Sequence, residues 1–389
     1  MTSAGPLFVV VVLLSVQHFT CTVHSKARFC ALGDFGADAL GGLGLSQEGT
    51  TAAIVKALDK QDRLDGILAL GDTNYPVGSE ATIDQNVGKY YGQYVWPSKS
   101  KLSSGAPDQI NRFFPCPGNH DWGNRNPGSL DAYLAYMPVS GRTNYDVVVK
   151  DVHIFSLDSD PNANRFNGTS SKSAQALWLK AGLAASTSTW KLVIFHHPPF
   201  SSSLHGSTLY MQWPFAEWGA TAVLSGHDHA YERFVKHGTG FPYFVNGLGG
   251  AYMYPFTKEP LEGSQARFSG RSSVQLIEAD STRMVFKLLA ATHQLPAAQV
   301  QTQGQKVLDV LPNVATEEMD CYEVVKSASG GNLYGPCHET LTGQGSTVNS
   351  VAVGSSQLSV EKDVSKQGKG LQLSFAAKKR KYVTKHREY

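Results

Sequence analysis

The stretch DGILALGDTNY, residues 65–75, contains a short apolar run that stops at a glycine and places Asp72 and Tyr75 in a polar turn. An apolar run of this length between turn residues predicts a buried β-strand. Sites in α/β folds lie at the carboxyl ends of strands, so both residues are candidates for binding a ligand or a metal ion. An Asp after Gly is more often simply part of a turn, and this stretch alone does not decide between the two.

Several other stretches share this design. Short apolar runs end at Gly, Pro or polar clusters in FCALGDFG (29–36), RFFPCPGNHDWG (112–123), WKLVIFHHPP (190–199) and ATAVLSGHDHAYER (220–233). Between these runs, TTAAIVKALDK (50–60) and SAQALWLKAGL (173–183) have the apolar spacing of helices. Alternating strands and helices predict an α/β domain with largely buried strands. The stretches 144–159 and 272–292 predict β-hairpins, and the second hairpin closes the domain.

The N-terminus predicts export. The apolar run at residues 6–16 is too short to span a bilayer but suits the core of a secretory signal peptide, with cleavage after Ser25. A buried first strand is the alternative. We therefore expect a secreted protein, or one in an endomembrane lumen such as a lysosome or vacuole, without a stable membrane span. The net charge of +2, with 17% charged residues, gives no indication of a nucleic-acid partner.

The cysteines agree with export. Removal of residues 1–25 would leave Cys30, Cys116, Cys321 and Cys337, an even number that predicts disulfides. We expect a local bridge between Cys321 and Cys337, whereas Cys30 and Cys116 either pair or remain buried thiols. The NGT at 167–169 is a sequon for N-glycosylation.

The composition changes beyond about residue 295, where Gln, Ser, Gly and Thr become frequent and strands become uncertain. We expect a signal peptide at 1–25, one main domain at 26–295 and a small C-terminal extension of unknown role at 296–389. The extension ends in the basic stretch KKRKYVTKHREY, which is a processing site, a surface-binding patch or a solvated end.

Strand ends throughout the main domain supply candidate metal ligands. They are Asp34, Asp72, Tyr75, Asn119, His196, His227 and His229. Oxygen and nitrogen donors without Cys suit hard or borderline transition ions better than a thiolate zinc site. Seven donors exceed the needs of one ion and favour two metals that share a carboxylate, an arrangement that hydrolyses phosphoesters.

The order of these motifs resembles the purple acid phosphatases, of the tartrate-resistant type, in the calcineurin-like metallophosphoesterase superfamily. The family patterns D-x-G, G-D-x-x-Y, G-N-H-[D/E], V-x-x-H and G-H-x-H stand here as DFG, GDTNY, GNHD, VIFH and GHDH, and the resemblance covers residues 27–292. It implies a four-layer α/β/β/α sandwich with two mixed β-sheets. It also implies an acid phosphatase that hydrolyses small phosphate monoesters by attack of a metal-bound hydroxide on phosphorus. The alternatives are a phosphodiesterase or nucleotide pyrophosphatase on the same metals, and a non-catalytic metal-binding surface protein.

The resemblance also implies which residues bind each metal. Asp34, Tyr75 and His229 would hold Fe(III), Asn119, His196 and His227 would hold a divalent ion (Fe, Zn or Mn), and Asp72 would bridge both. Many metallophosphoesterases have a His ligand where Gly36 stands, so Tyr75 is its replacement. A phenol of pKa ~10 ionises at acid or neutral pH only beside a strongly charged cation, which favours Fe(III).

The remaining candidates are histidines and one carboxylate. The resemblance implies that His120 contacts phosphate and protonates the leaving group. We expect Asp121 to orient the His120 ring, the alternative being a structural Asp that caps the stretch 121–128. Strand alternation lets only one of His196 and His197 face the metals. The motif assigns His196, which leaves His197 behind the site or facing outward. His205 lies in SLHGST (203–208), which resembles the loop that carries a second substrate histidine in members of the tartrate-resistant type. We therefore expect His205 to bind phosphate or donate a proton, the alternative being an ordinary exposed loop histidine.

Overall fold

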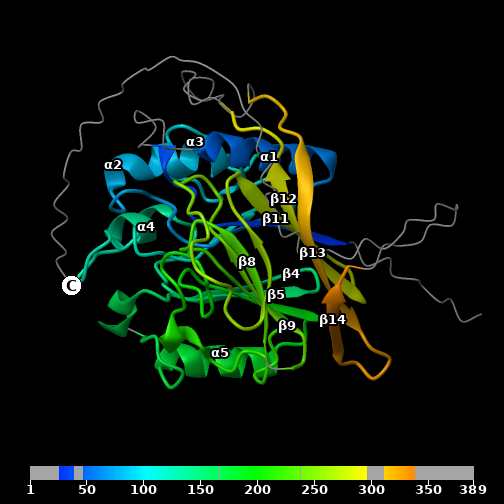
Figure 1. Cartoon of the computed structure of the whole chain (residues 1–389). Helices are drawn as coiled ribbons and strands as arrows, with labels where there is room; N and C mark the ends of the chain where they lie inside the picture. The colour runs from blue at the N-terminus through cyan, green and yellow to red at the C-terminus, as the bar shows by residue number, and fades with distance from the viewer. Residues whose placement is uncertain (1–25, 39–46, 166, 237, 296–310, 338–389) are drawn as a thin grey trace, which may run out of the picture. The chain divides into compact units, whose positions relative to one another are not determined.

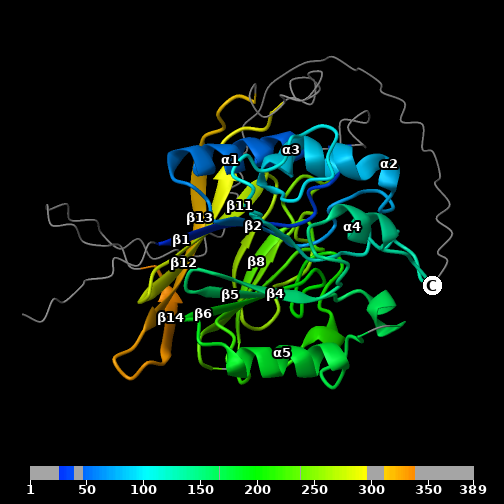
Figure 2. The same ribbon diagram turned by 180° about the vertical axis from the view of Figure 1, so that it is seen from behind.

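The computed structural model describes residues 26–38, 47–165, 167–236, 238–295 and 311–337. The predicted signal peptide at 1–25 and most of the predicted extension lie outside these ranges. The described residues form two seven-stranded β-sheets packed face to face, with helices on the outer faces (Figures 1 and 2). The predicted four-layer α/β/β/α sandwich with two mixed sheets is confirmed.

The first sheet has the order β14-β13-β12-β11-β1-β2-β3. Its strands are β1 (Ala27–Leu32), β2 (Gly66–Ala69), β3 (Phe113–Pro115), β11 (Ser273–Ala279), β12 (Arg283–Ala291), β13 (Thr316–Lys326) and β14 (Asn332–Pro336). Strands β1, β2 and β3 are parallel, and the others pair antiparallel. Alternate residues of β1 serve different layers: Phe29 and Ala31 pack between the sheets, whereas Cys30 and Leu32 face the helices.

The second sheet has the order β10-β8-β9-β7-β6-β5-β4. Its strands are β4 (Tyr145–Val149), β5 (Val152–Ser156), β6 (Trp190–Ile194), β7 (Ala222–Ser225), β8 (Tyr231–Lys236), β9 (Phe241–Asn246) and β10 (Ser264–Phe268). Strands β5, β6, β7 and β9 run parallel. The predicted hairpins are present as β4–β5 and β11–β12.

Helices cover the two outer faces. The first sheet is covered by α1 (Glu48–Gln61) and α4 (Asp131–Tyr136). Between them in the sequence, it is also covered by the consecutive helices α2 (Glu80–Ile83), η2 (Asp84–Gly88), which is π-helical, and α3 (Lys89–Tyr91). The second is covered by α5 (Ala174–Ala185), and single 3₁₀ turns are η3 (Gly92–Tyr94), η4 (Pro161–Arg165) and η5 (Leu209–Met211). Helix α5 begins after Ser173, whose hydroxyl accepts a hydrogen bond from the N–H of Ala176. None of the helices in the described ranges is long and apolar enough to cross a membrane.

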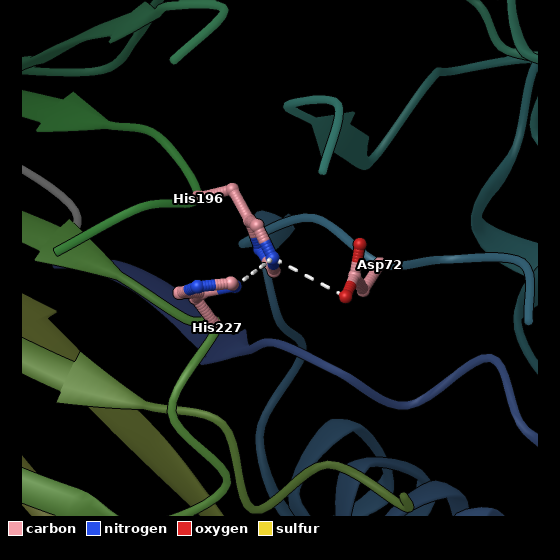
Figure 3. A group of neighbouring side chains, drawn as sticks. All are labelled: Asp72, His196 and His227. Atoms are coloured by element: carbon pink, nitrogen blue, oxygen red, sulfur yellow. Dashed lines mark hydrogen bonds and ion pairs between the residues drawn. The ribbon is translucent and has the colours of Figure 1, made fainter. Parts of the chain in front are cut away.

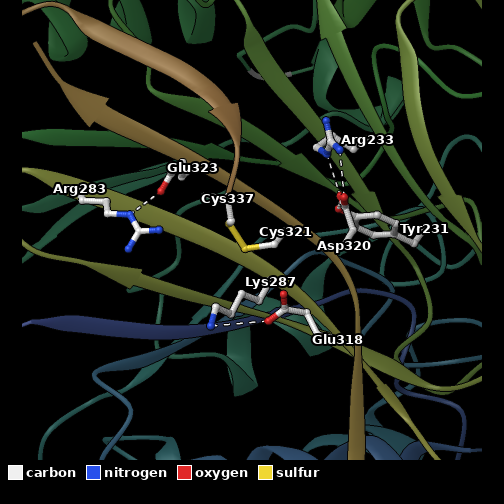
Figure 4. The surroundings of a disulfide bond; sticks show 9 residues. All are labelled: Tyr231, Arg233, Arg283, Lys287, Glu318, Asp320, Cys321, Glu323 and Cys337. Carbon is white, nitrogen blue, oxygen red and sulfur yellow. Dashed lines mark hydrogen bonds and ion pairs between the residues drawn. A yellow bond between two sulfur atoms is a disulfide. The ribbon is translucent and has the colours of Figure 1, made fainter. Parts of the chain in front are cut away.

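Strands β13 and β14 carry the first sheet past residue 295, into the stretch that the sequence assigned to an extension. Their polar sequence hid them because β13 begins with four exposed residues and is buried only at Tyr322, Glu323 and Val324. Asp320 of β13 also joins the two sheets: its carboxylate accepts hydrogen bonds from Arg233 at 2.7 and 2.9 Å and from the Tyr231 hydroxyl at 2.6 Å (Figure 4). Residues 311–337 therefore belong to the sandwich.

The predicted Cys321–Cys337 disulfide is present, with Cα atoms 5.4 Å apart, and it ties β14 to β13 (Figure 4). Cys30 and Cys116 are buried free thiols, which decides between the two alternatives left open by the sequence. They belong to different core layers, Cys30 beneath the helices and Cys116 between the sheets.

Candidate metal centre

The ends of five parallel strands supply the site. Asp34 follows β1, Asp72 and Tyr75 follow β2, Asn119 follows β3, His196 follows β6, and His227 and His229 follow β7. Strands β1 to β3 belong to one sheet, and β6 and β7 belong to the other. The two sheets deliver these side chains to one place, because parallel strands end at the same edge of their sheet.

Asp34, Tyr75 and His229 form one group, which we call the oxygen-rich half. The Tyr75 hydroxyl lies 3.2 Å from Asp34 Oδ1 and 3.0 Å from His229 Nε2. His229 Nε2 in turn lies 3.3 Å from Asp34 Oδ1. Tyr75 is buried, so its hydroxyl is part of the site and does not reach solvent.

Asn119, His196 and His227 form a second group, which we call the nitrogen-rich half. His196 Nε2 lies 3.1 Å from Asn119 Oδ1 and 3.2 Å from His227 Nδ1. Figure 3 shows both imidazoles turned toward the carboxylate of Asp72.

One atom, Asp72 Oδ2, belongs to both halves. It lies 3.0 Å from the Tyr75 hydroxyl and 3.2 Å from His196 Nε2. The other carboxylate oxygen, Oδ1, accepts a hydrogen bond from the backbone N–H of His120 at 2.8 Å. This is the position that a bridging carboxylate needs.

The backbone around the site is strained in a way that marks function. Asp34, Asp72 and His227 have φ angles of 59°, 51° and 72°, a left-handed conformation that costs non-glycine residues about 1–3 kcal/mol each. The neighbouring Gly71 has a φ of 87°, and a Cβ placed there would lie 2.5 Å from His196 Nδ1. The turns therefore trade backbone stability for close approach of the donors.

No side chain fits at Gly36, the position for which the resemblance led us to expect Tyr75 as the replacement of a histidine ligand. A Cβ added to Gly36 would lie 1.8 Å from the Thr73 carbonyl oxygen. The Gly36 carbonyl accepts a hydrogen bond from the N–H of Tyr75 at 2.8 Å. Thr73 thus excludes a histidine at Gly36, and the Gly36 carbonyl helps to position Tyr75.

Backbone carbonyls orient two of the imidazoles. His196 Nδ1 donates to the carbonyl of Leu70 at 2.8 Å, and His229 Nδ1 donates to the carbonyl of Tyr252. A carbonyl only accepts, so Nδ1 carries the hydrogen in each ring and the Nε2 lone pair faces the centre. His227 presents Nδ1 instead. These lone pairs, the carboxylates and the phenol fit two metal ions, one in each half.

Burial alone would raise the pKa of Asp72, but the imidazoles of His196 and His120 together hold it well below its usual value. Burial would lower the pKa of His196, and Asp72 and Asp34 raise it to about 10 instead. Burial and the carboxylates of Asp72 and Asp34 raise the pKa of Tyr75 well above its ordinary value. The protein alone keeps Tyr75 as a neutral phenol.

His120 lies at the oxygen-rich half, its ring 4.1 Å from that of Tyr75 and its Nε2 4.0 Å from Asp72 Oδ2. The prediction that Asp121 orients this ring is corrected. His120 Nδ1 instead contacts the carbonyl of Pro76 at 2.6 Å, and Asp121 accepts hydrogen bonds from the hydroxyl of Thr73 and the N–H of Gly118. The buried Asp121 faces away from its neighbour and joins the β2 and β3 turns.

His205 and His197 lie at the nitrogen-rich half. The exposed His205 ring stacks on His227 with centroids 4.3 Å apart. His197 is buried behind the site, 4.4 Å from the same ring, and its Nδ1 lies 2.9 Å from the Ser159 hydroxyl. Of the two places predicted for His197, the structure shows the one behind the site.

Two residues at the site were not singled out from the sequence. Tyr254 stacks on His229 at 4.3 Å, and nothing in its surroundings in the sequence marks it. Asp228 lies between His227 and His229 in the GHDH motif, and its carboxylate contacts the loop that carries His205. The motif does not reveal this, because GHDH lies in the turn after β7, where side chains do not have to alternate.

Comparison with known proteins agrees with this geometry. Residues 27–231 match the family described as calcineurin-like phosphoesterase. The chain belongs to this family. Family membership and the donor set together indicate a metal-dependent phosphoesterase with a dinuclear site, acting on phosphate esters.

Two solved structures share the fold of this family member. GAP50, the anchor in the inner membrane complex of Plasmodium, aligns with a TM-score of 0.51 and 17% identity over 79% of this chain and 99% of its own. The purple acid phosphatase PPD1 from yellow lupin seeds aligns with a TM-score of 0.52 and 15% identity over 72% of this chain and 53% of its own. At these identities the likeness shows the fold alone. No curated protein sequence matches the chain.

Proposed function

We propose that this phosphoesterase is a purple-type acid phosphatase that hydrolyses phosphate monoesters with Fe(III) and a divalent ion (Fe, Zn or Mn). The observation that carries the proposal is the Tyr75 hydroxyl, 3.0 Å from Asp72 Oδ2 and 3.2 Å from Asp34 Oδ1. Burial and two carboxylates raise its pKa, so the phenolate forms only beside a highly charged cation. A trivalent ion meets that need better than a divalent one.

The two halves would each hold one ion. Asp34, Tyr75 and His229 would hold Fe(III), Asn119, His196 and His227 would hold the divalent ion, and Asp72 would contact both. Two bound ions activate water and neutralise charge on phosphate oxygens.

His120 and His205 act on the substrate from opposite sides. The Pro76 carbonyl holds the Nδ1 hydrogen of His120, so its Nε2 faces the centre and, when protonated, donates to the departing alcohol. The exposed ring of His205, stacked on His227, contacts the phosphate at the other half. Two donors aimed at the phosphate oxygens stabilise the charge that develops there.

We further propose that the protein works in the extracellular space or an endomembrane lumen. The Cys321–Cys337 disulfide supports an oxidising compartment, because such bridges are rare in the reducing cytosol. An acidic lumen also suits the site, because the bound metal ion, and not a high pH, would remove the proton from Tyr75.

The main competing proposal is a non-catalytic protein. GAP50, which shares the fold, is described as an anchor, so the fold alone does not establish turnover. The full set of donors around Asp72 Oδ2 supports catalysis, because a protein that only needs the scaffold has no use for the strained turns at Asp34, Asp72 and His227.

Metal analysis together with a visible spectrum and paired ester substrates tests the proposal. We expect one Fe and one divalent ion per chain, a tyrosinate-to-iron band in the visible, and faster hydrolysis of monoesters than of diesters at acid pH. A colourless, active enzyme with two zinc ions would refute the Fe(III) assignment. A strong diester preference would refute the substrate class, and full metal occupancy without turnover would refute catalysis.

A further inference from the structure

Asp228 is a buried carboxylate without a role in the site described so far. Its neighbours His227 and His229 face the metal centre, whereas Asp228 contacts the loop at 201–206. A charge that is fully removed from water needs several hydrogen bonds to be tolerated. The position of those bonds shows what the carboxylate holds.

Three donors from one loop satisfy Asp228. Its Oδ2 accepts from the Ser201 hydroxyl at 2.5 Å and from the N–H of Gly206 at 3.3 Å, and its Oδ1 accepts from the N–H of His205 at 2.8 Å. Hydrogen bonds to an ionised acceptor are roughly twice as strong as neutral ones. The backbone of His205 is therefore fixed directly to the strand end that carries His227.

The ring of His205 has no comparable anchor of its own. It is exposed and makes ring contacts with His227 at 4.3 Å and with Tyr254 at 5.5 Å. Within the described part of the chain, the only hydrogen bond of His205 is the one that its backbone N–H donates to Asp228. The position of the imidazole thus depends on where Asp228 holds the main chain.

A second carboxylate holds the same loop at another point and provides a comparison. Glu232, also buried, accepts from the N–H and the hydroxyl of Ser202, both at 2.7 Å, and from the Ser264 hydroxyl at 2.6 Å. Glu232 anchors the base of the loop and does not touch His205. Glu232 therefore holds only the loop, whereas Asp228 also holds the backbone of His205.

We propose that Asp228 is a positioning residue for the reaction, which holds the backbone of His205 so that its imidazole lies over His227 and meets the phosphate. The inference rests on the proposed function, in which His205 contacts the substrate. It predicts that Asp228 matters for the reaction only as long as His205 is present.

A double-mutant cycle on the full, metal-loaded protein tests this, with inorganic phosphate affinity and kcat as separate readouts. We expect Asp228→Asn to lower kcat and phosphate affinity by about tenfold each, with metal content and visible spectrum unchanged. In the background of His205→Ala, the same change should have almost no further effect. Additive effects, or loss of a metal equivalent in Asp228→Asn, would overturn the proposal.

Two neighbouring serines supply a milder matched pair in case Asp228→Asn does not fold. Ser201→Ala removes one hydrogen bond to Asp228, and Ser202→Ala removes one to Glu232. We expect both variants to lose similar thermal stability, but only Ser201→Ala to lower kcat, by about threefold to tenfold, and only when His205 is present. Equal effects of both on kcat would overturn the proposal.

The phosphate readout separates this inference from the proposed function. A wild-type protein that binds phosphate but hydrolyses no ester would refute the phosphatase, and the affinity cycle would still test Asp228. If His205→Ala leaves phosphate affinity and kcat unchanged, His205 does not meet the substrate, and the positioning role of Asp228 is refuted.

Discussion

Around Tyr75 the metal centre is lined by carboxylate and phenol oxygens, whereas around His227 it is lined by imidazoles. His196, His197 and His205 all lie within 5.0 Å of the His227 ring, measured between centroids. Burial and these imidazoles lower the pKa of His227 well below its ordinary value, which keeps it neutral. The oxygen-rich half brings negative charge to its ion, and the nitrogen-rich half brings mostly neutral donors.

If the centre holds two unlike ions, as proposed, this difference would let each half select its own ion. Hard, highly charged ions prefer anionic oxygen ligands, and borderline divalent ions accept imidazole. The two halves differ in this respect although both reach the same Asp72 oxygen. If the halves are separate, removing a donor from one half should spare the ion of the other, whereas removing the shared Asp72 oxygen should affect both.

Asp72→Ala should have the largest effect, because it removes the oxygen common to both halves. We expect loss of both metal ions and a fall in kcat/KM of about 10⁴-fold or more. Metal analysis of the purified variant measures the first and ester hydrolysis the second. Retention of one full equivalent would show that one half binds its ion without the shared carboxylate.

Tyr75→Phe and His196→Ala should separate the halves. Tyr75→Phe removes a donor only from the oxygen-rich half, so we expect the visible band to disappear while the divalent ion remains. His196→Ala should lose the divalent ion and keep the colour. Activity should fall in both variants by about 10²–10³-fold. The companion measurement is the order in which a chelator removes the two metals from the wild type. Loss of both ions in either variant would mean that the halves are not independent.

Gly36→Ala tests why the oxygen-rich half uses a tyrosine. Its new Cβ would overlap the Thr73 carbonyl, so we expect a loss of about 1–3 kcal/mol in the free energy of unfolding and weaker binding of the ion in the oxygen-rich half. Gly335→Ala is the matched control, since a Cβ there has no atom within 4 Å. If Gly36→His combined with Tyr75→Phe restored binding of the ion in the oxygen-rich half, the steric explanation would be wrong.

The strand ends could be read from the sequence because each one combines a buried apolar run with a polar turn. Strands β13 and β14 could not, since most of their residues are exposed or half-buried, and the stretch around Asp320 therefore looks like a polar loop. The direction of Asp121 was also out of reach, because a turn between β3 and the following loop has no fixed alternation. Pairing of Cys321 with Cys337 was predictable from their spacing, and the β13–β14 hairpin between them is its cause.

The smallest effect is expected at His197, which contacts the nitrogen-rich half without belonging to it. The Ser159 hydroxyl oxygen accepts a hydrogen bond from the backbone N–H of His197 at 2.9 Å. The hydrogen of the same hydroxyl is therefore free to be donated to the unprotonated ring Nδ1 of His197. His197→Ala should therefore leave both ions bound and reduce kcat by less than about threefold. Loss of the divalent ion would place His197 among the ligands and contradict the division proposed here.

The pH dependence of stability gives His197 a signature of its own. Burial and the charge of His196 lower the pKa of His197 to about 3, below its value in the unfolded chain, so the unfolded state binds more protons between these two pKa values. Its contribution is present above about pH 6.5 and is lost as the pH falls toward 3, by up to about 1.4 kcal/mol per pH unit. Unfolding free energies measured between pH 7 and 4 should thus fall less steeply in His197→Ala than in the wild type. His293→Ala is the matched control, because it removes an exposed imidazole instead of a buried one, and it should follow the wild type.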